Sequence, residues 1–118
     1  MDILKIAQEI ERRIRLLDLG RQELPKRAKL KAETMAEYER ELSKTILRLR
    51  NEKVEWEGQV IENSPATLVE KIAKGMMWEK KLEADLAESS YKNAFKGVDI
   101  LQAQLNGFQS IYRHLSEL

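Results

Sequence analysis

The only histidine and the closely spaced carboxylates are the residues that could support acid–base or metal chemistry. His114 precedes Glu117 by three residues. Two ligands at this spacing do not form a metal site without further partners. A cation in the last turn of a helix is also stabilised by the helix dipole. We therefore expect His114 to be structural or solvent-exposed and to bind no metal.

Carboxylates repeat every fourth residue from Glu33 through Glu37 to Glu41, beside the basic residues Arg40 and Lys44. Opposite charges three residues apart on a helix pair in solvent, which predicts a salt-bridged outer face. The sequence has no Gly-rich phosphate loop, nucleophile elbow or metalloprotease motif, and Cys is 0. We expect no catalytic residue, no cofactor and no small-molecule substrate, so the chain is predicted not to be an enzyme.

A basic stretch near the N-terminus is the stronger functional candidate. Its cations are Arg12, Arg13, Arg15, Arg21, Lys26, Arg27, Lys29 and Lys31. Clustered Lys and Arg on a helix bind phosphates or an acidic protein surface without needing a special fold. The alternative is a solvated helix face, because Glu9 and Glu11 precede Arg13 and Arg15 by four residues and no aromatic side chain lies among the cations.

A second candidate is an apolar cluster in the second half of the chain. Met76, Met77 and Trp78 are consecutive, and Trp78 points away from the main apolar stripe of its predicted helix. With Trp56 they form a candidate protein interface, since Met and Trp are common interface anchors. The alternative is that the segment 54–61 or a second copy of the chain covers Trp78.

Two heptad rows predict one long helix over residues 3–50. The first row is Ala7, Ile14, Arg21, Ala28, Met35, Leu42 and Leu49, and the second is Ile3, Ile10, Leu17, Leu24, Lys31, Tyr38 and Thr45. The phase continues through Gly20 and Pro25, which favours one helix kinked near Pro25. The alternative is a reversal at Gly20, which would give a three-helix bundle.

A second long helix is predicted over residues 65–116. Ser64 is its expected N-cap and Pro65 its first residue. Apolar residues then alternate at spacings of three and four from Ala84 to Leu115. The stripe continues past Asn106-Gly107, so we expect the helix to continue there, although nothing in the sequence explains an outward-facing Gly107.

The connection over residues 51–64 breaks the helical period. Val54 and Trp56 alternate with charged residues, and Glu57-Gly58 is a turn signal, which predicts a short β-hairpin or an ordered loop. Two helices of matched length joined this way form an antiparallel hairpin, with position i beside about 116 − i. The fold class is therefore all-α, a long coiled-coil-like helical hairpin in one domain over residues 1–118.

Composition agrees with this fold. The 118 residues include only five Gly and two Pro, too few for the reversals of a sandwich or barrel, and 35% are charged. Residues 1–50 carry a net +4 and residues 51–118 a net −3. The absence of Cys argues against an oxidising compartment. With no signal peptide or membrane-length apolar run, we expect a cytoplasmic protein without membrane contact.

Apolar residues outside the two heptad rows predict self-association. They are Leu4, Ile6, Leu16, Leu30, Leu47, Leu82, Leu86 and Phe95. Two helices cannot cover so wide an apolar surface, so a dimer that forms a four-helix bundle is the simplest expectation.

Several segments of the sequence match a pattern that also occurs in other small proteins. Residues 64–75 read SPATLVEKIAKG, and residues 47–51, 88–92 and 105–112 fit the same pattern. Together they resemble small helical proteins of unknown activity from the early regions of Gram-positive phages and prophages. The match covers about residues 40–115. The resemblance implies a non-enzymatic accessory protein encoded among recombination and replication functions, and it implies no catalytic residues.

These observations predict a phage or prophage accessory protein that self-associates and binds DNA or a DNA-processing partner through the basic stretch. Two alternatives are a protein-interaction module that inhibits a host or defence protein, and a purely structural assembly element.

Overall fold

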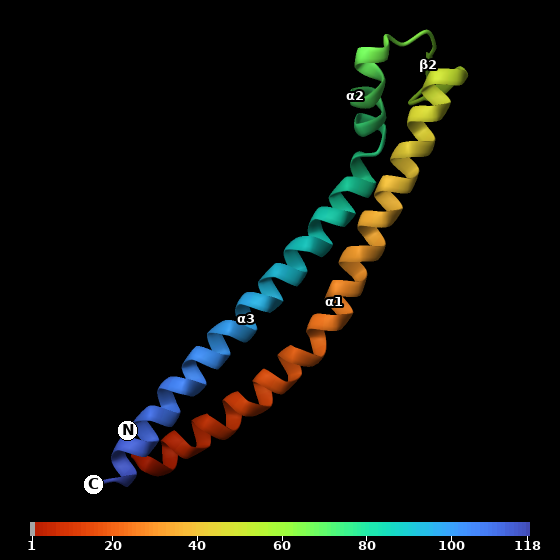
Figure 1. The fold of residues 1–118 in the computed structure, drawn as a ribbon. Coiled ribbons are helices and arrows are strands. Elements are labelled where there is room, and N and C mark those ends of the chain that lie inside the picture. The colour runs from red at the N-terminus through yellow and green to blue at the C-terminus, as the bar shows by residue number, and fades with distance from the viewer. Residues whose placement is uncertain (1) are drawn as a thin grey trace. The chain divides into compact units, whose positions relative to one another are not determined.

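The fold is a helical hairpin with a small β-hairpin between its helices. A computed structural model describes residues 2–118. The elements, in chain order, are α1 (Ile3–Asn51), β1 (Val54–Trp56), β2 (Gln59–Ile61), α2 (Ala66–Met76) and α3 (Trp78–Ser116) (Figure 1). The predicted all-α class, with antiparallel helices and a short β-hairpin in the connection, is confirmed.

The chain packs into two compact units. Unit 1 combines the residues up to Lys29 with Ser89–Leu118, so it pairs the first part of α1 with the last part of α3. Unit 2 is the continuous segment Leu30–Glu88, which holds the rest of both helices, the β-hairpin and α2. The single domain and the dimer expected from the sequence stay predictions.

In unit 1, α1 passes through both helix-breaking residues. Gly20 and Pro25 lie inside the 49-residue helix, so the alternative of a reversal at Gly20 is wrong. A Cβ atom on Gly20 would lie 3.1 Å from Cγ2 of Val98 on α3, so the residue allows close helix packing. Pro25 is exposed, and water can therefore reach the Arg21 carbonyl that Pro25 cannot bond.

One predicted heptad row is displaced by one residue over much of α1. Ile6 and Thr34 are buried, whereas Ile14 is half-exposed and Arg21 exposed. The placement of Ile6 outside the core was therefore wrong. Further along, the predicted row holds, since Leu49 is buried. The reason is that an α-helix has 3.6 residues per turn, so a heptad row drifts by about 20° every seven residues.

Facing residues confirm the predicted antiparallel pairing within each unit. Arg13 lies against Gln104 in unit 1, and Glu37 lies against Lys80 in unit 2. The residue numbers of both pairs add up to 117, close to the expected 116. Ala84 and Ala87 of α3 are buried.

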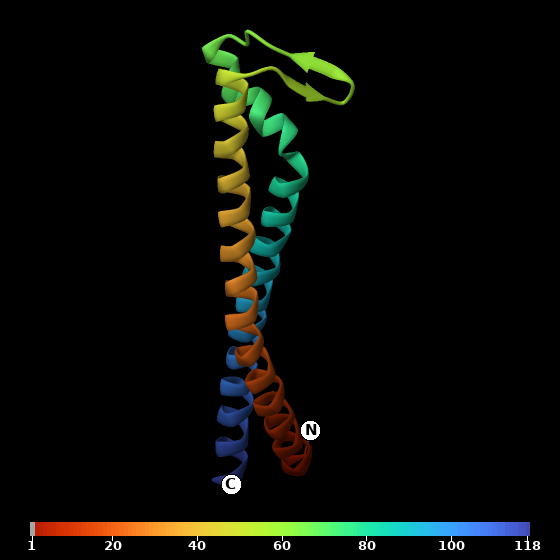
Figure 2. The same ribbon diagram turned by 90° about the vertical axis from the view of Figure 1, so that its right-hand side faces the viewer.

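The β-hairpin closes the core of unit 2. β1 and β2 pair antiparallel, with Val54 opposite Ile61 (Figure 2). Glu57 and Gly58 both have positive φ, 51° and 76°, as a two-residue type I′ turn requires. The pairing buries Val54 against a cluster that lies at the end of α1 and on α2. The buried members of this cluster are Leu49, Val54, Val69 and Ala73.

The second predicted helix is divided at Met77. The N–H of Met77 is shared between the carbonyls of Ala73 and Lys74, at 3.0 and 3.2 Å, so one turn tightens and regular geometry is interrupted. Gly75, in the same turn, has poor helix propensity. The expected Ser64 cap is also wrong, because α2 starts at Ala66 after Pro65 and has no side-chain cap.

Candidate interaction surfaces

The predicted basic stretch divides into cations that hold unit 1 together and cations that face solvent. Arg13 belongs to the first group, with only 16% of its side chain exposed. It bonds the carboxylate of Glu9, and its Nε donates to Oε1 of Gln104 at 3.2 Å. Its guanidinium also lies 4.4 Å from the ring centre of Phe108. Arg13 therefore links α1 to α3 and is not available to a phosphate.

Arg21 and Arg27 also point toward α3. Arg21 donates to Oε1 of Gln102 at 2.9 Å, and Arg27 donates to the carbonyl of Ser90 at 3.3 Å. Arg27 further lies 3.8 Å from the carboxylate of Glu23. These polar contacts span the two helices of unit 1, which explains why Arg recurs on this side of α1.

Four cations remain on the solvent side of α1. Arg12, Arg15, Lys26 and Lys29 are exposed and lie on the helix face opposite the buried Leu17. We call these four residues the outer basic face; Lys31, the last of the predicted cations, is half-buried.

Acidic neighbours neutralise part of this face. Arg12 lies 3.6 Å from Glu9, and Lys26 lies 3.6 Å from Glu23. Over residues 2–118, Arg15 forms no ion pair with Glu11, contrary to expectation. The outer surface of α1 is therefore positive, but it contains only four of the eight cations that the sequence predicted for it.

The predicted interface residues have different environments. Met76 packs against the core cluster of unit 2, so it is structural. Trp56 and Met77 are half-buried. Only Trp78 is exposed, with 54% of its surface accessible at the start of α3.

Trp78 continues into an apolar surface that the sequence reasoning did not assemble. Leu82 and Leu86 follow it at spacings of four and are 49% and 62% exposed. Residues at i, i+4 and i+8 share one helix face, so these three residues form what we call the Trp78 surface. The signal was available, since Leu82 and Leu86 fall outside the main stripe of α3.

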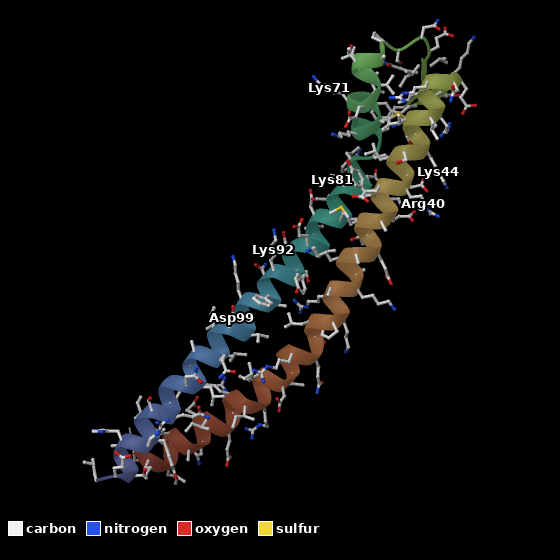
Figure 3. All side chains as sticks on the ribbon, in the orientation of Figure 1. Arg40, Lys44, Lys71, Lys81, Lys92 and Asp99 are labelled. Atoms are coloured by element: carbon white, nitrogen blue, oxygen red, sulfur yellow. The ribbon has the colours of Figure 1, made fainter. Side chains whose placement is uncertain are left out.

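A polar boundary accompanies the Trp78 surface. Lys81 bonds Asp85 at 3.2 Å, and this hydrogen bond, with the attraction between the two charges, raises the pKa of Lys81. The Lys81 ammonium also lies 5.4 Å from the ring centre of Tyr38 on α1. Figure 3 labels Lys81 on α3 and places Lys71 on the side of α2 away from α1.

The expected salt-bridged face of α1 is present in unit 2. Glu37 pairs with Arg40 at 2.7 Å, and Glu41 with Lys44 at 3.7 Å. Glu37 also reaches Lys80 on α3 at 3.5 Å. Desolvation raises the pKa of Glu37, but Arg40 and Lys80 together outweigh it and hold the pKa below its ordinary value. These carboxylates serve in ion pairs.

An open groove lies between the helices of unit 1. Its volume is about 510 Å³, and its apolar lining residues include Ala7 and Ile10 of α1 and Tyr112 of α3. Glu11 lines the α1 edge and Arg113 the α3 edge. We call this feature the side groove. Ala7, Ile10 and Tyr112 are apolar heptad positions in the sequence, which predicts no groove there.

Within residues 2–118, no three His, Cys, Asp or Glu side chains are grouped so that they could hold a metal ion. His114 is exposed near the end of α3. None of the helices in this part of the chain has an apolar stretch of the length needed to cross a bilayer.

Comparison of the chain with protein-family models, with curated proteins and with solved structures finds no match. The resemblance to phage proteins therefore stays a prediction.

Proposed function

We propose that this chain is a non-catalytic helical protein that acts by self-association and by contact with another macromolecule. This is the role expected of a phage or prophage accessory protein in the cytoplasm of a bacterial host. The observation that carries the proposal is the large apolar surface left exposed. Ile14, Ile100 and the Trp78 surface all have more than 40% of their large apolar side chains accessible.

Exposure on this scale favours contact with other molecules. Monomeric proteins rarely leave contiguous apolar patches exposed, and larger patches mark interaction sites. In this chain the fully buried large side chains are only Ile6, Val54 and Val69 within residues 2–118. Association would bury part of this exposed apolar area, and the hydrophobic effect therefore favours it.

The oligomeric state tests this proposal. We expect light scattering of the full chain between 5 and 200 µM to give a mass approaching twice the 13.8 kDa of one copy. The triple substitution Trp78→Ser, Leu82→Ser and Leu86→Ser distinguishes the surfaces: loss of association assigns it to the Trp78 surface, and retention assigns it elsewhere. A mass of one chain at 200 µM would contradict self-association.

A second candidate function is contact with DNA or with a DNA-processing partner through the outer basic face. The observation that favours it is that four cations lie together on the solvent side of α1. Lys and Arg in such an arrangement bind phosphates with an affinity that falls steeply as salt rises.

A gel-shift titration at 50 and 200 mM salt, with single- and double-stranded DNA, tests this function. We expect Arg12→Gln, Arg15→Gln, Lys26→Gln and Lys29→Gln together to abolish a salt-sensitive shift. The matched control removes two Arg and two Lys from unit 2, at Arg48, Arg50, Lys71 and Lys74. Equal loss in both variants would show that only net charge matters, and absence of any shift at 50 mM salt would exclude DNA.

A further inference from the structure

We propose that the side groove of unit 1 receives a second copy of this chain, in a two-fold arrangement that places Glu11 of each copy opposite Arg113 of the other. This inference rests on the proposed self-association and assigns it to one surface. The side groove joins α1 and α3, so the partner would contact both helices of unit 1.

The side of α1 that lines the groove is apolar. Ile3 and Ile14 are each 42% exposed, and they flank Ala7 and Ile10 along the helix. These four residues are spaced by four, three and four, the pattern of helices that pack against a neighbour. The drift of the heptad row in unit 1 turned Ile6 toward α3 and left this row half-exposed. A second helical layer would bury it.

The opposite side of the helix pair combines exposed apolar side chains, among them Leu16, Ile100 and Ile111, with polar contacts between the helices. There Arg13 of α1 donates a hydrogen bond to Gln104 of α3 and another to Glu9 of its own helix. A partner on that side would have to bury or displace these hydrogen bonds, at a cost of about 1 kcal/mol or more for each bond left unmade. The two sides of unit 1 thus differ in that a partner at the side groove leaves these hydrogen bonds intact.

The charges in the side groove also favour a second copy of the chain as its partner. Glu11 lines the groove from α1 and Arg113 lines it from α3, and no ion pair of either side chain is found within residues 2–118. A surface that carries one unpaired acid and one unpaired base at its two edges is complementary to itself. Isologous contact between identical copies needs this property.

The symmetry follows from where these charges lie. With a two-fold axis parallel to the helices, α1 of one copy rests on α3 of the other at the same level. Glu11 then meets Arg113 of the second copy, and Arg113 meets Glu11 of the second copy. A two-fold axis perpendicular to the helices would instead stack α1 on α1 and leave both charges unpaired.

Charge reversal tests this arrangement without touching the core. Glu11→Arg alone would oppose two arginines at each of the two symmetric contacts, and Arg113→Glu alone would oppose two glutamates at each. We expect each variant to dimerise about tenfold more weakly than the native chain, since two exposed pairs change from attraction to repulsion. Mixed in equal amounts, the two variants would restore both pairs, and we expect a heterodimer within about threefold of native affinity.

The mixing experiment separates the possible outcomes. Circular dichroism must first show native helicity for each variant. Asp18→Arg and Lys96→Glu, exposed charges away from the groove, are the matched controls and should leave the dimer unchanged. A native chain that is monomeric would overturn the proposed function itself. A native dimer that is insensitive to both reversals, or a mixture no tighter than its components, would overturn the side-groove inference and leave self-association standing.

Discussion

At the scale of single residues, the basic stretch shows how one residue type serves two purposes. Arg13 and Arg15 are two positions apart, yet one is nearly covered between the helices of unit 1 and the other faces solvent. An Arg side chain suits the covered position because its planar guanidinium can bond a carboxylate and an amide while stacking on a ring. A cluster of cations in a sequence therefore does not by itself mark a binding surface.

Replacing Arg13 by Ala should destabilise the chain by about 1–3 kcal/mol, because the contacts with Glu9, Gln104 and Phe108 are lost and the carboxylate of Glu9 keeps only the exposed Arg12 as a partner. Urea unfolding at a fixed protein concentration measures this. Arg15→Ala is the control and should change the free energy of unfolding by less than about 0.5 kcal/mol. Equal effects at the two positions would contradict the assigned roles.

Gly20 on α1 and Gly107 on α3 also differ in their surroundings. A Cβ on Gly107 would have nothing within 4 Å, so Gly107→Ala should stabilise the helix by about 0.5–1 kcal/mol through lower entropy of the unfolded chain. At Gly20 the same gain is offset by the 3.1 Å approach to Val98. We expect thermal unfolding to show a higher Tm for Gly107→Ala than for Gly20→Ala. The reverse order would contradict the close packing at Gly20.

At the scale of elements, most of the fold could be predicted because the periodicity is strong. The continuity of α1 through Pro25 and the Glu57-Gly58 turn both follow from local pattern and backbone preference. The side on which a helix packs is harder to predict, because a drift of 20° per heptad is too small to show in the pattern but exchanges Ile14 for Ile6 in the core. The division at Met77 was missed because the segment before Ala84 lacks a regular stripe.

The side on which a helix packs also decides which residues form the candidate surfaces, and these are therefore equally hard to predict. A list of cations can be read from the sequence, but whether Arg27 bonds α3 or faces solvent depends on the helix rotation. The side groove depends on it too, because the groove consists of positions that the rotation leaves half-covered. Residues on α1 and α3 line it together, and no local pattern links Glu11 to Arg113.

The contact between α1 and α3 in unit 2 predicts a dependence on pH. The folded-state pKa of Glu37 lies below its ordinary value of 4.5, so its ion pairs stabilise the fold above that pH and lose this effect as the pH falls through the folded pKa. Glu37→Gln should therefore lower the Tm at pH 7, and the difference from the native chain should shrink below pH 4.5 and then vanish.

Glu39→Gln provides the control for this measurement, since Glu39 is exposed and close to Glu37 in the chain. It should leave the Tm unchanged at both pH values. A gap between Glu37→Gln and the native chain that stayed constant from pH 7 to pH 3 would show that the effect of Glu37 is not electrostatic.

At the scale of the whole molecule, the two units differ in how the chain builds them. Unit 2 is one continuous segment, and it contains its own buried cluster around Val54 and Val69. Unit 1 consists of two segments that are distant in the sequence, and the chain connects them through unit 2. Local contacts form at a lower entropic cost than contacts between distant segments. We therefore expect unit 2, the continuous segment, to be the more stable of the two units.

The fragment Leu30–Glu88 should accordingly fold without the rest of the chain. We expect circular dichroism at 5 °C to show helix and thermal unfolding to be cooperative, with a lower Tm than the full chain because so short a segment buries little apolar area. The fragment 30–62 is the control: it keeps the β-hairpin but lacks α2, so Val54 loses the partners Val69 and Ala73 and the segment should not unfold cooperatively. Equal behaviour of the two fragments would mean that the cluster joining the hairpin to α2 does not stabilise unit 2.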